Sequence, residues 1–99
     1  MGADFILAPE AAHDVNEAYA WHERRRTGLG EDFLGCVEAC IERLCRNPEW
    51  FEIVHERYRR AIVRRFPFAI FYEYDGDRVT IYAVFHTACD PTIWRERLG

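Results

Sequence analysis

The chain lacks serine, lysine and glutamine altogether, and these absences exclude several reaction classes. Serine triads, lysine Schiff bases and P-loop nucleotide sites each require a side chain that is missing here. All 13 basic residues are arginine, whose guanidinium stays charged and suits carboxylates and phosphates rather than proton transfer. The basic residues are therefore expected to bind anions, and the sequence predicts no cofactor.

Long apolar runs are absent as well. No stretch of the chain approaches the roughly 18 to 20 consecutive apolar residues of a membrane helix. The N-terminus also lacks the basic region and the apolar core that together make a secretion signal. We therefore expect a cytoplasmic protein that makes no contact with a membrane.

The four cysteines do not follow a metal-binding pattern. Cys36, Cys40, Cys45 and Cys89 form neither CxxC pairs nor a common zinc spacing. The first three fall in one helical stretch, where cysteine acts as a small buried hydrophobe. We predict free thiols and no metal. The competing interpretation is half a metal site, in which Cys36 and Cys40 face His22 across a helical hairpin.

Charge is divided unevenly along the chain, whose net charge is −4 at pH 7. Residues 1–56 hold 12 acidic and 5 basic residues, whereas residues 57–99 hold 5 acidic and 8 basic ones. Within the basic half, residues 57–65 contain five arginines and no acidic residue. This block indicates an anionic partner, and an acidic protein segment fits better than nucleic acid because the whole chain is acidic. The competing interpretation is an edge strand that its charges protect from aggregation.

Hydrophobic periodicity predicts a helical first half. Residues 5–8 form a short apolar run that is expected to be a strand, and two stretches with helical spacing follow, at 9–26 and at about 30–47. Gly28 separates them as a stop signal, and Asn47-Pro48 ends the second one. Two amphipathic helices joined by a short loop make a helical hairpin.

The second half is expected to be mainly sheet, because its period approaches two and β-branched and aromatic residues predominate. Strands are expected at 59–65, 68–74 and 78–87, the last two joined by the turn residues Asp75-Gly76-Asp77. A short helix is expected over 91–97. The sequence therefore predicts a single α+β domain over 1–99, with an N-terminal helical hairpin packed on a mainly antiparallel sheet of three to four strands.

Strand alternation predicts which side chains meet the helices. In the last strand, the set expected to face the helices is Val79, Ile81, Ala83 and Phe85. The set expected on the open side is Thr80, Tyr82, Val84 and His86. In the arginine-rich strand, Arg60 and Arg64 share one face, and Arg59 and Arg65 share the other. His86 is a candidate general base or ligand on the open side, although a lone histidine is more often structural.

A series of short segments, none specific alone, stands in a distinctive order along nearly the whole chain. The segments are Pro9-Glu10-Ala11, Gly28-Leu29-Gly30 with Phe33, Asn47-Pro48, Tyr58-Arg59-Arg60, Arg64-Arg65-Phe66-Pro67-Phe68 with Ile70-Phe71-Tyr72, and Ala83-Val84-Phe85-His86-Thr87 with Asp90-Pro91 and Trp94. Their order and spacing resemble the RelE/ParE superfamily of toxins from type II toxin-antitoxin modules, often described as plasmid stabilisation proteins. The resemblance implies a curved sheet and a hetero-oligomer with a cognate antitoxin, whose acidic segment wraps the toxin.

The two branches of this superfamily differ in mechanism. The resemblance implies that RelE-like members cut mRNA on the ribosome with basic sheet residues, an arginine after the last strand and often a C-terminal tyrosine. This chain keeps Arg60, but Ala69, Cys89 and Trp94 stand where ionisable groups are expected. RNA cleavage needs proton donors and acceptors besides positive charge. We therefore predict a ParE-like inhibitor that binds DNA gyrase without chemistry of its own.

Two alternatives stay open at this point. A ribosome-dependent mRNA endonuclease would use as catalytic residues Arg60, Arg64, His86 and Arg95. The other alternative is a toxin-derived domain that has lost activity and serves only as a binding module. For contact with the antitoxin or the target, we predict residues of the arginine block, the last strand and the C-terminal helix: Arg57, Arg59, Arg60, Arg64, Arg65, Tyr82, His86, Trp94, Arg95 and Arg97.

Overall fold

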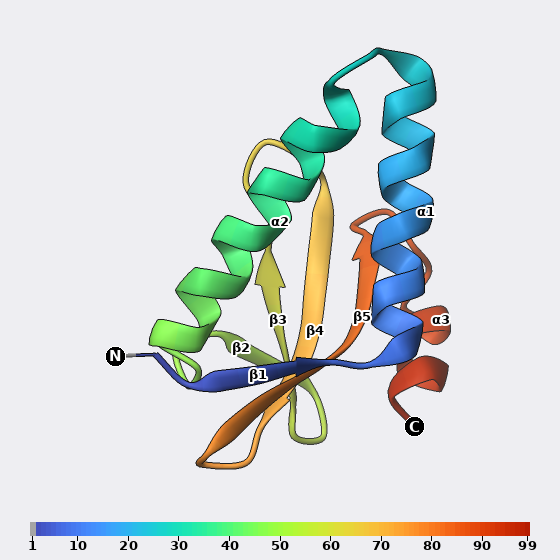
Figure 1. Cartoon of the computed structure of the whole chain (residues 1–99). Helices are drawn as coiled ribbons and strands as arrows, with labels where there is room; N and C mark the ends of the chain where they lie inside the picture. The colour runs from blue at the N-terminus through green and yellow to red at the C-terminus, as the bar shows by residue number, and fades with distance from the viewer. Residues whose placement is uncertain (1) are drawn as a thin grey trace.

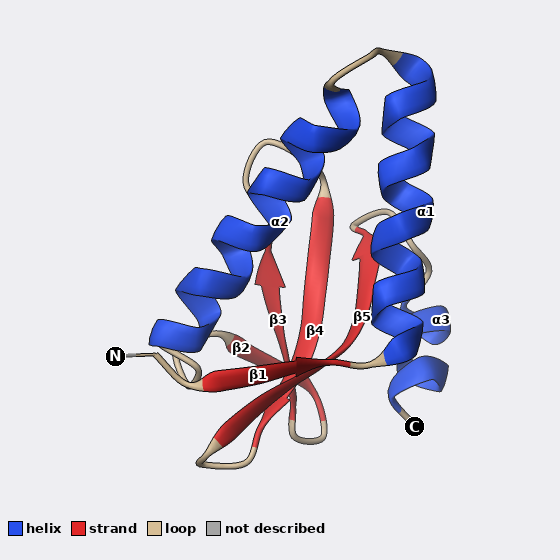
Figure 2. Cartoon of the chain, viewed as in Figure 1, coloured by secondary structure: helices blue, strands red, loops and turns tan. Residues whose placement is uncertain are grey.

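A helical hairpin covers one face of a five-stranded sheet (Figure 1). The structure is a computed structural model that describes residues 2–99. Its helices are α1 (Pro9–Arg25), α2 (Leu29–Arg46) and α3 (Pro91–Leu98). Its strands are β1 (Asp4–Leu7), β2 (Glu52–His55), β3 (Tyr58–Ile62), β4 (Phe68–Tyr74) and β5 (Arg78–His86). The predicted α+β fold class is confirmed (Figure 2).

The sheet is mixed, with the strand order β1-β5-β4-β3-β2. β1 pairs with β5 in parallel, and the other neighbouring strands pair antiparallel. The sheet has five strands rather than three to four because β2 joins β3 through a two-residue turn at Glu56 and Arg57. The sequence did not indicate β2, since its residues are exposed or half-buried and show no alternation between buried and exposed positions.

The helical hairpin forms where the sequence predicts it. Pro9 occupies the first position of α1, where a missing N–H costs nothing. Gly28 has a φ of 92°, which suits glycine, and the Glu23 carboxylate accepts hydrogen bonds of 2.9 Å from the N–H groups of Gly28 and Gly30. At Gly30 a Cβ would lie 2.9 Å from the Tyr19 carbonyl oxygen, so glycine lets the two helices approach closely. None of the helices within residues 2–99 combines the length and apolarity that a bilayer crossing needs.

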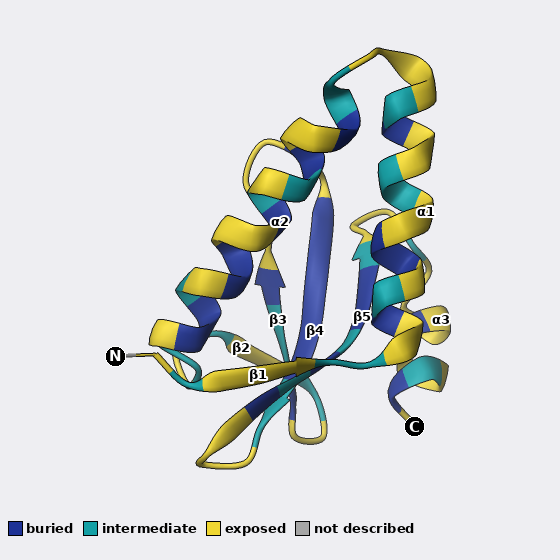
Figure 3. Ribbon diagram, viewed as in Figure 1, coloured by how far each residue is buried: buried dark blue, intermediate teal, exposed yellow. Residues whose placement is uncertain are grey.

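The main core lies between the hairpin and the sheet (Figure 3). Phe33 and Leu44 of α2 are fully buried against Ile70 of β4 and Ile81 of β5. Each such side chain contributes about 1.5–3 kcal/mol by burial. His22 belongs to the same layer, since its ring stacks on Phe33 at 4.7 Å between centroids. His22 therefore packs in the core.

A second, smaller core lies on the opposite face of the sheet, beneath α3. The Trp94 ring of α3 stacks on Phe71 of β4 at 4.9 Å between centroids. Leu98, Ala69 and Ala83 complete this layer. α3 therefore covers part of the face that strand alternation alone leaves open.

A bulge in β5 makes the predicted faces wrong for the residues that follow it. Phe71 lies opposite Ala83, but the next residue of β4, Tyr72, lies opposite Ile81, so Tyr82 is an extra residue. An extra residue reverses the alternation that follows it. Val79 and Ile81 face the hairpin as predicted, whereas Val84 joins the hairpin core and Ala83 joins the α3 core. Phe85 follows Ala83 to the α3 side.

The arginine-rich strand is shorter than predicted. β3 ends at Ile62, so Arg64 and Arg65 lie in the loop before β4 rather than in a strand over 59–65. Phe66 in this loop is buried in the main core, which pulls the chain inward and ends the strand pairing. Arg65 has a φ of 74°, a left-handed conformation that costs a non-glycine residue about 1–2 kcal/mol.

Candidate functional site

The arginine block divides into residues that hold the fold together and residues that face solvent. Arg57 forms an ion pair with Glu73, and this hydrogen bond raises the pKa of the guanidinium. Arg59 donates to the carbonyl oxygens of Glu49 at 3.0 Å and Phe51 at 2.8 Å. Both guanidinium groups therefore have partners inside the chain.

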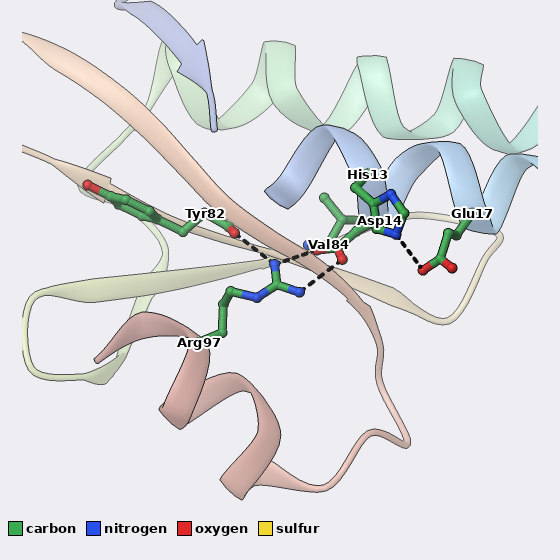
Figure 4. A network of polar contacts seen from close by, with 6 residues as sticks. All are labelled: His13, Asp14, Glu17, Tyr82, Val84 and Arg97. Atoms are coloured by element: carbon green, nitrogen blue, oxygen red, sulfur yellow. Dashed lines mark hydrogen bonds and ion pairs between the residues drawn. The ribbon is translucent and has the colours of Figure 1, made fainter. Parts of the chain in front are cut away.

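Arg97 of α3 also has a structural role (Figure 4). Its guanidinium donates to both carboxylate oxygens of Asp14 in α1, at 2.9 and 3.1 Å, and to the Tyr82 carbonyl oxygen at 3.2 Å. The buried Asp14 also accepts from the N–H of Val84 at 3.0 Å. β1 ends at Leu7, opposite Ile81, so these two side chains satisfy the edge of β5 where the neighbouring strand has stopped.

Two other predicted binding residues are largely occupied by neighbours. The Tyr82 hydroxyl donates to Glu73 at 3.1 Å, and partial burial together with this bond raises the pKa of the phenol. Trp94 is buried on Phe71, so it offers little surface to a partner. Arg95 is exposed, and its guanidinium lies 5.2 Å from the centroid of the Trp94 ring.

Arg60 and Arg64 line a groove between the end of α2 and β3. Its volume is about 560 Å³, and it is lined by Arg43, Asn47, Trp50, Phe51, Glu52, Arg60, Ile62 and Arg64. Arg60 lies 3.4 Å from the Glu52 carboxylate across the β2–β3 pair. Arg64 has no hydrogen bond or ion pair to any of residues 2–99, and it is exposed. Arg65 is exposed beside it, with its guanidinium near the Phe66 ring. Of the two block arginines in this groove, Arg60 therefore has a carboxylate partner and Arg64 does not.

His86 does not lie on the open side as predicted. The bulge turns it toward the hairpin, where it lines a groove of about 370 Å³ with Trp21, Phe68 and other residues of α1 and β5. Its ring lies 5.3 Å from Phe68, and its Nδ1 accepts from the N–H of Ala88 at 3.0 Å. Arg60 belongs to the opposite face, since it pairs with Phe71 of the α3 core.

The candidate catalytic residues therefore do not line a common cavity. Arg60 and Arg64 share one groove, His86 lines another, and Arg95 lies on α3. Apart from its arginines, the first groove contains a single ionisable side chain, Glu52. One carboxylate can accept a proton, but in-line RNA cleavage also needs a group that protonates the leaving oxygen.

Comparison with known proteins assigns the family. Residues 5–91 match the family model described as the ParE toxin of the type II toxin-antitoxin system parDE. The chain belongs to the ParE toxin family. No curated protein matches the sequence.

Solved structures of ParE-like and RelE-like systems share the fold. A chain of the chromosomal ParDE system from P. aeruginosa aligns with a TM-score of 0.64 at 16% identity, covering 85% of this chain and 95% of that one. A chain of the RelBE2 toxin-antitoxin complex from Mycobacterium tuberculosis aligns with a TM-score of 0.62 at 17% identity, covering 87% and 99%. Both solved structures share the fold of this chain, so the fold by itself does not decide the cellular target.

The four cysteines of this ParE family member are free thiols, two of them buried and two half-buried. Cys40 and Cys45 are buried, and burial raises the pKa of both thiols. The Cys40 Sγ donates to the Ile62 carbonyl oxygen at 3.6 Å. Residues 2–99 contain no cluster of three or more metal-ligating side chains, so Cys36, Cys40 and His22 do not come together.

The sequence analysis missed two important residues, one on the surface and one buried. Trp50 is 81% exposed, the highest value among the large apolar side chains that stand out as exposed. Asp14 is buried although it lies in an amphipathic helix with ordinary spacing. A signal existed for Trp50, because a tryptophan two residues after a helix-ending proline has no place in a periodic core pattern. Nothing in the sequence marks Asp14, whose partners lie 70 and 83 residues away.

Proposed function

We propose that this ParE family protein is a growth-arresting toxin that inhibits DNA gyrase by binding it. In this proposal the toxin acts in the cytoplasm and is neutralised by a cognate antitoxin with an acidic segment. Family membership supports the toxin role, and the half-buried Arg60 and the exposed Arg64 support an anionic segment as partner.

The separation of Arg60 from His86 is the observation that carries inhibition by binding rather than by catalysis. The two residues lie on opposite faces of the sheet and line different grooves. Arginine stabilises the charge of a phosphorane, but its pKa lies so far above neutral pH that it does not shuttle protons there. A ribonuclease that used the groove of Arg60 and Arg64 would lack one of its two proton-transfer groups.

The test has two readouts, gyrase supercoiling activity with purified protein and transcript integrity after induction of the wild-type chain in cells. We expect the purified chain to inhibit supercoiling by gyrase, and we expect transcripts in the arrested cells to stay intact. A His86→Ala variant is run in parallel. Prompt, codon-positioned mRNA cleavage that disappears in His86→Ala would contradict the gyrase proposal and favour the endonuclease. Full antitoxin binding without growth arrest would identify an inactive binding module.

A further inference from the structure

The most exposed tryptophan among residues 2–99 lies in a positively charged groove. Trp50 is 81% exposed and lines the groove together with Arg60 and Arg64. Ile62, which is 49% exposed, adds a second apolar surface to the same groove. Tryptophan and arginine are the residue types that most often dominate the binding energy of protein interfaces. An apolar and cationic surface of this kind is expected to have a partner.

The loop that carries Trp50 is held rigidly from within the fold. The buried Tyr72 donates its hydroxyl to the Pro48 carbonyl oxygen at 2.8 Å. Arg59 holds the carbonyl oxygens of Glu49 and Phe51 on either side of Trp50. The Trp50 N–H in turn donates to the Asn47 carbonyl oxygen at 3.0 Å. The backbone is therefore fixed around a side chain that has no packing role of its own, which is the arrangement of a preorganised anchor.

The charges around Trp50 favour an acidic partner. Arg43, Arg60 and Arg64 line the groove, against the single carboxylate of Glu52. Arg43 donates to the Ile62 carbonyl oxygen at 3.1 Å, and Arg60 faces Glu52 at 3.4 Å, so both retain free donors. Arg64 has all its donors free within the described residues 2–99. A groove that is lined by three guanidinium groups and one indole can bind two carboxylates that flank an apolar side chain.

We propose that the Trp50 groove is where an acidic segment of the antitoxin docks. One apolar side chain of that segment packs between Trp50 and Ile62, and its neighbouring carboxylates pair with Arg64 and Arg60. This inference rests on the proposed toxin-antitoxin function and adds its contact surface. A protein segment fits better than RNA, since the net charge of −4 opposes a polyanion whereas a few local carboxylates meet only the groove.

The experiment uses the toxin co-expressed with the protein encoded by the adjacent reading frame. Affinity is measured for the wild type, Trp50→Ala and Arg64→Glu at two salt concentrations. We expect Trp50→Ala to weaken the complex about thirty-fold, as removal of a hot-spot tryptophan does. Arg64→Glu should weaken it and also reduce its salt dependence.

Two matched variants control for general effects of lost tryptophan or altered charge. Trp21→Ala removes another exposed tryptophan, and Arg26→Glu reverses another exposed arginine, both outside the groove. These variants should bind as the wild type does. Because Trp50 is exposed, Trp50→Ala should melt within about 2 °C of the wild type, and a thermal scan checks this.

Each other outcome overturns the inference in a distinct way. A wild-type complex that Trp50→Ala and Arg64→Glu leave unchanged removes the groove from the interface and keeps the proposed function. Loss of growth arrest by Trp50→Ala with unchanged antitoxin affinity assigns the groove to the target. Binding of a 20-nucleotide single-stranded RNA that Trp50→Ala abolishes, again with unchanged antitoxin affinity, assigns it to nucleic acid. If the wild type neither binds the adjacent protein nor arrests growth, the proposed function itself fails.

Discussion

The edge of β5 and the groove beside β3 use arginine in opposite ways. At the β5 edge, Arg97 finds a carboxylate and a backbone carbonyl within 3.2 Å, and the buried Asp14 joins α1, β5 and α3. At the groove, Arg64 finds no partner in residues 2–99, and Trp50 stands exposed beside it. The first arrangement pairs the edge of β5, whereas the second leaves the Arg64 donors and the Trp50 ring available to a partner.

The difference teaches how to separate structural from binding arginines in this small protein. A guanidinium carries five donors, and the fold decides how many of them meet acceptors from the same chain. Arg97 and Arg59 each donate to backbone carbonyl oxygens of other segments of the chain. Loss of their guanidinium groups should cost stability, whereas loss of the Arg64 guanidinium should cost only binding.

Removal of the Asp14 carboxylate deletes the hydrogen bonds that it accepts at the edge of β5, and it has the largest expected effect on stability. We expect Asp14→Ala to lower the free energy of unfolding by about 3 kcal/mol, because it leaves Arg97 and the Val84 N–H without their partner. Urea denaturation measures the change. Glu17→Ala, one turn further along α1, is the control, since Glu17 only pairs with the exposed His13 (Figure 4). This control should change the free energy of unfolding by less than about 0.5 kcal/mol. Equal losses in the two variants would contradict the structural role of the Asp14–Arg97 ion pair.

Removal of the Tyr72 hydroxyl tests the support beneath the groove. Burial raises the pKa of this hydroxyl, so it stays protonated and donates to Pro48. Tyr72→Phe should lower the free energy of unfolding by about 1–2 kcal/mol, because it leaves the Pro48 carbonyl without its donor. Amide exchange at Trp50 should accelerate as the loop loosens. Tyr74→Phe is the control, since its hydroxyl has no hydrogen bond within residues 2–99. Identical melting of the two variants would remove Tyr72 from the loop support.

The left-handed Arg65 offers a change with the opposite sign. Arg65→Gly should raise the free energy of unfolding by about 0.5 kcal/mol, since glycine adopts a φ of 74° without strain. Arg64→Gly should lower it by about 0.5–1 kcal/mol, because only the entropic cost of glycine remains there. Chemical denaturation of both variants compares the two neighbours. A stabilised Arg64→Gly or a destabilised Arg65→Gly would contradict this assignment of strain.

The smallest expected effect concerns the start of α3 in acid. Asp90 accepts from the Thr92 hydroxyl at 2.7 Å and from the Thr92 N–H at 2.9 Å, and these bonds lower the pKa of its carboxyl. A lowered folded pKa stabilises the protein above the unfolded value of about 3.9 and loses this stabilisation as pH falls through the folded value. Asp90→Ala should therefore melt below the wild type at pH 7 and close to it at pH 2.

Thermal melts of both proteins across this pH range measure the effect. Asp77→Ala, at an exposed turn carboxylate with no side-chain hydrogen bond within residues 2–99, is the control and should show no such convergence. A difference between Asp90→Ala and the wild type that stays constant down to pH 2 would contradict the role of the ionised cap.

Local signals explain which parts of the fold the sequence predicted. Pro9, Gly28 and Pro48 mark the ends of the hairpin helices, and the structure places the boundaries within three residues of them. The turn at Asp75-Gly76-Asp77 was equally clear, because Asp75 caps it with bonds to the N–H groups of Asp77 and Arg78. The predictions that were wrong concern features that depend on contacts between distant parts of the chain. Burial of Phe66 shortens the arginine strand, and the bulge at Tyr82 turns His86 toward the hairpin.

The amino-acid sequence by itself determined the α+β class, the helical hairpin, the β4–β5 hairpin and the ParE-like character, because each follows from periodicity, turn residues or the order of short segments. Only the tertiary structure decided which arginines are free. Arg57, Arg59 and Arg97 resemble Arg64 in sequence, but their acceptors come from other elements that meet them only after folding. The sequence alone gives the charge of a guanidinium, whereas the hydrogen-bond acceptors of its donors come from the segments that pack around it.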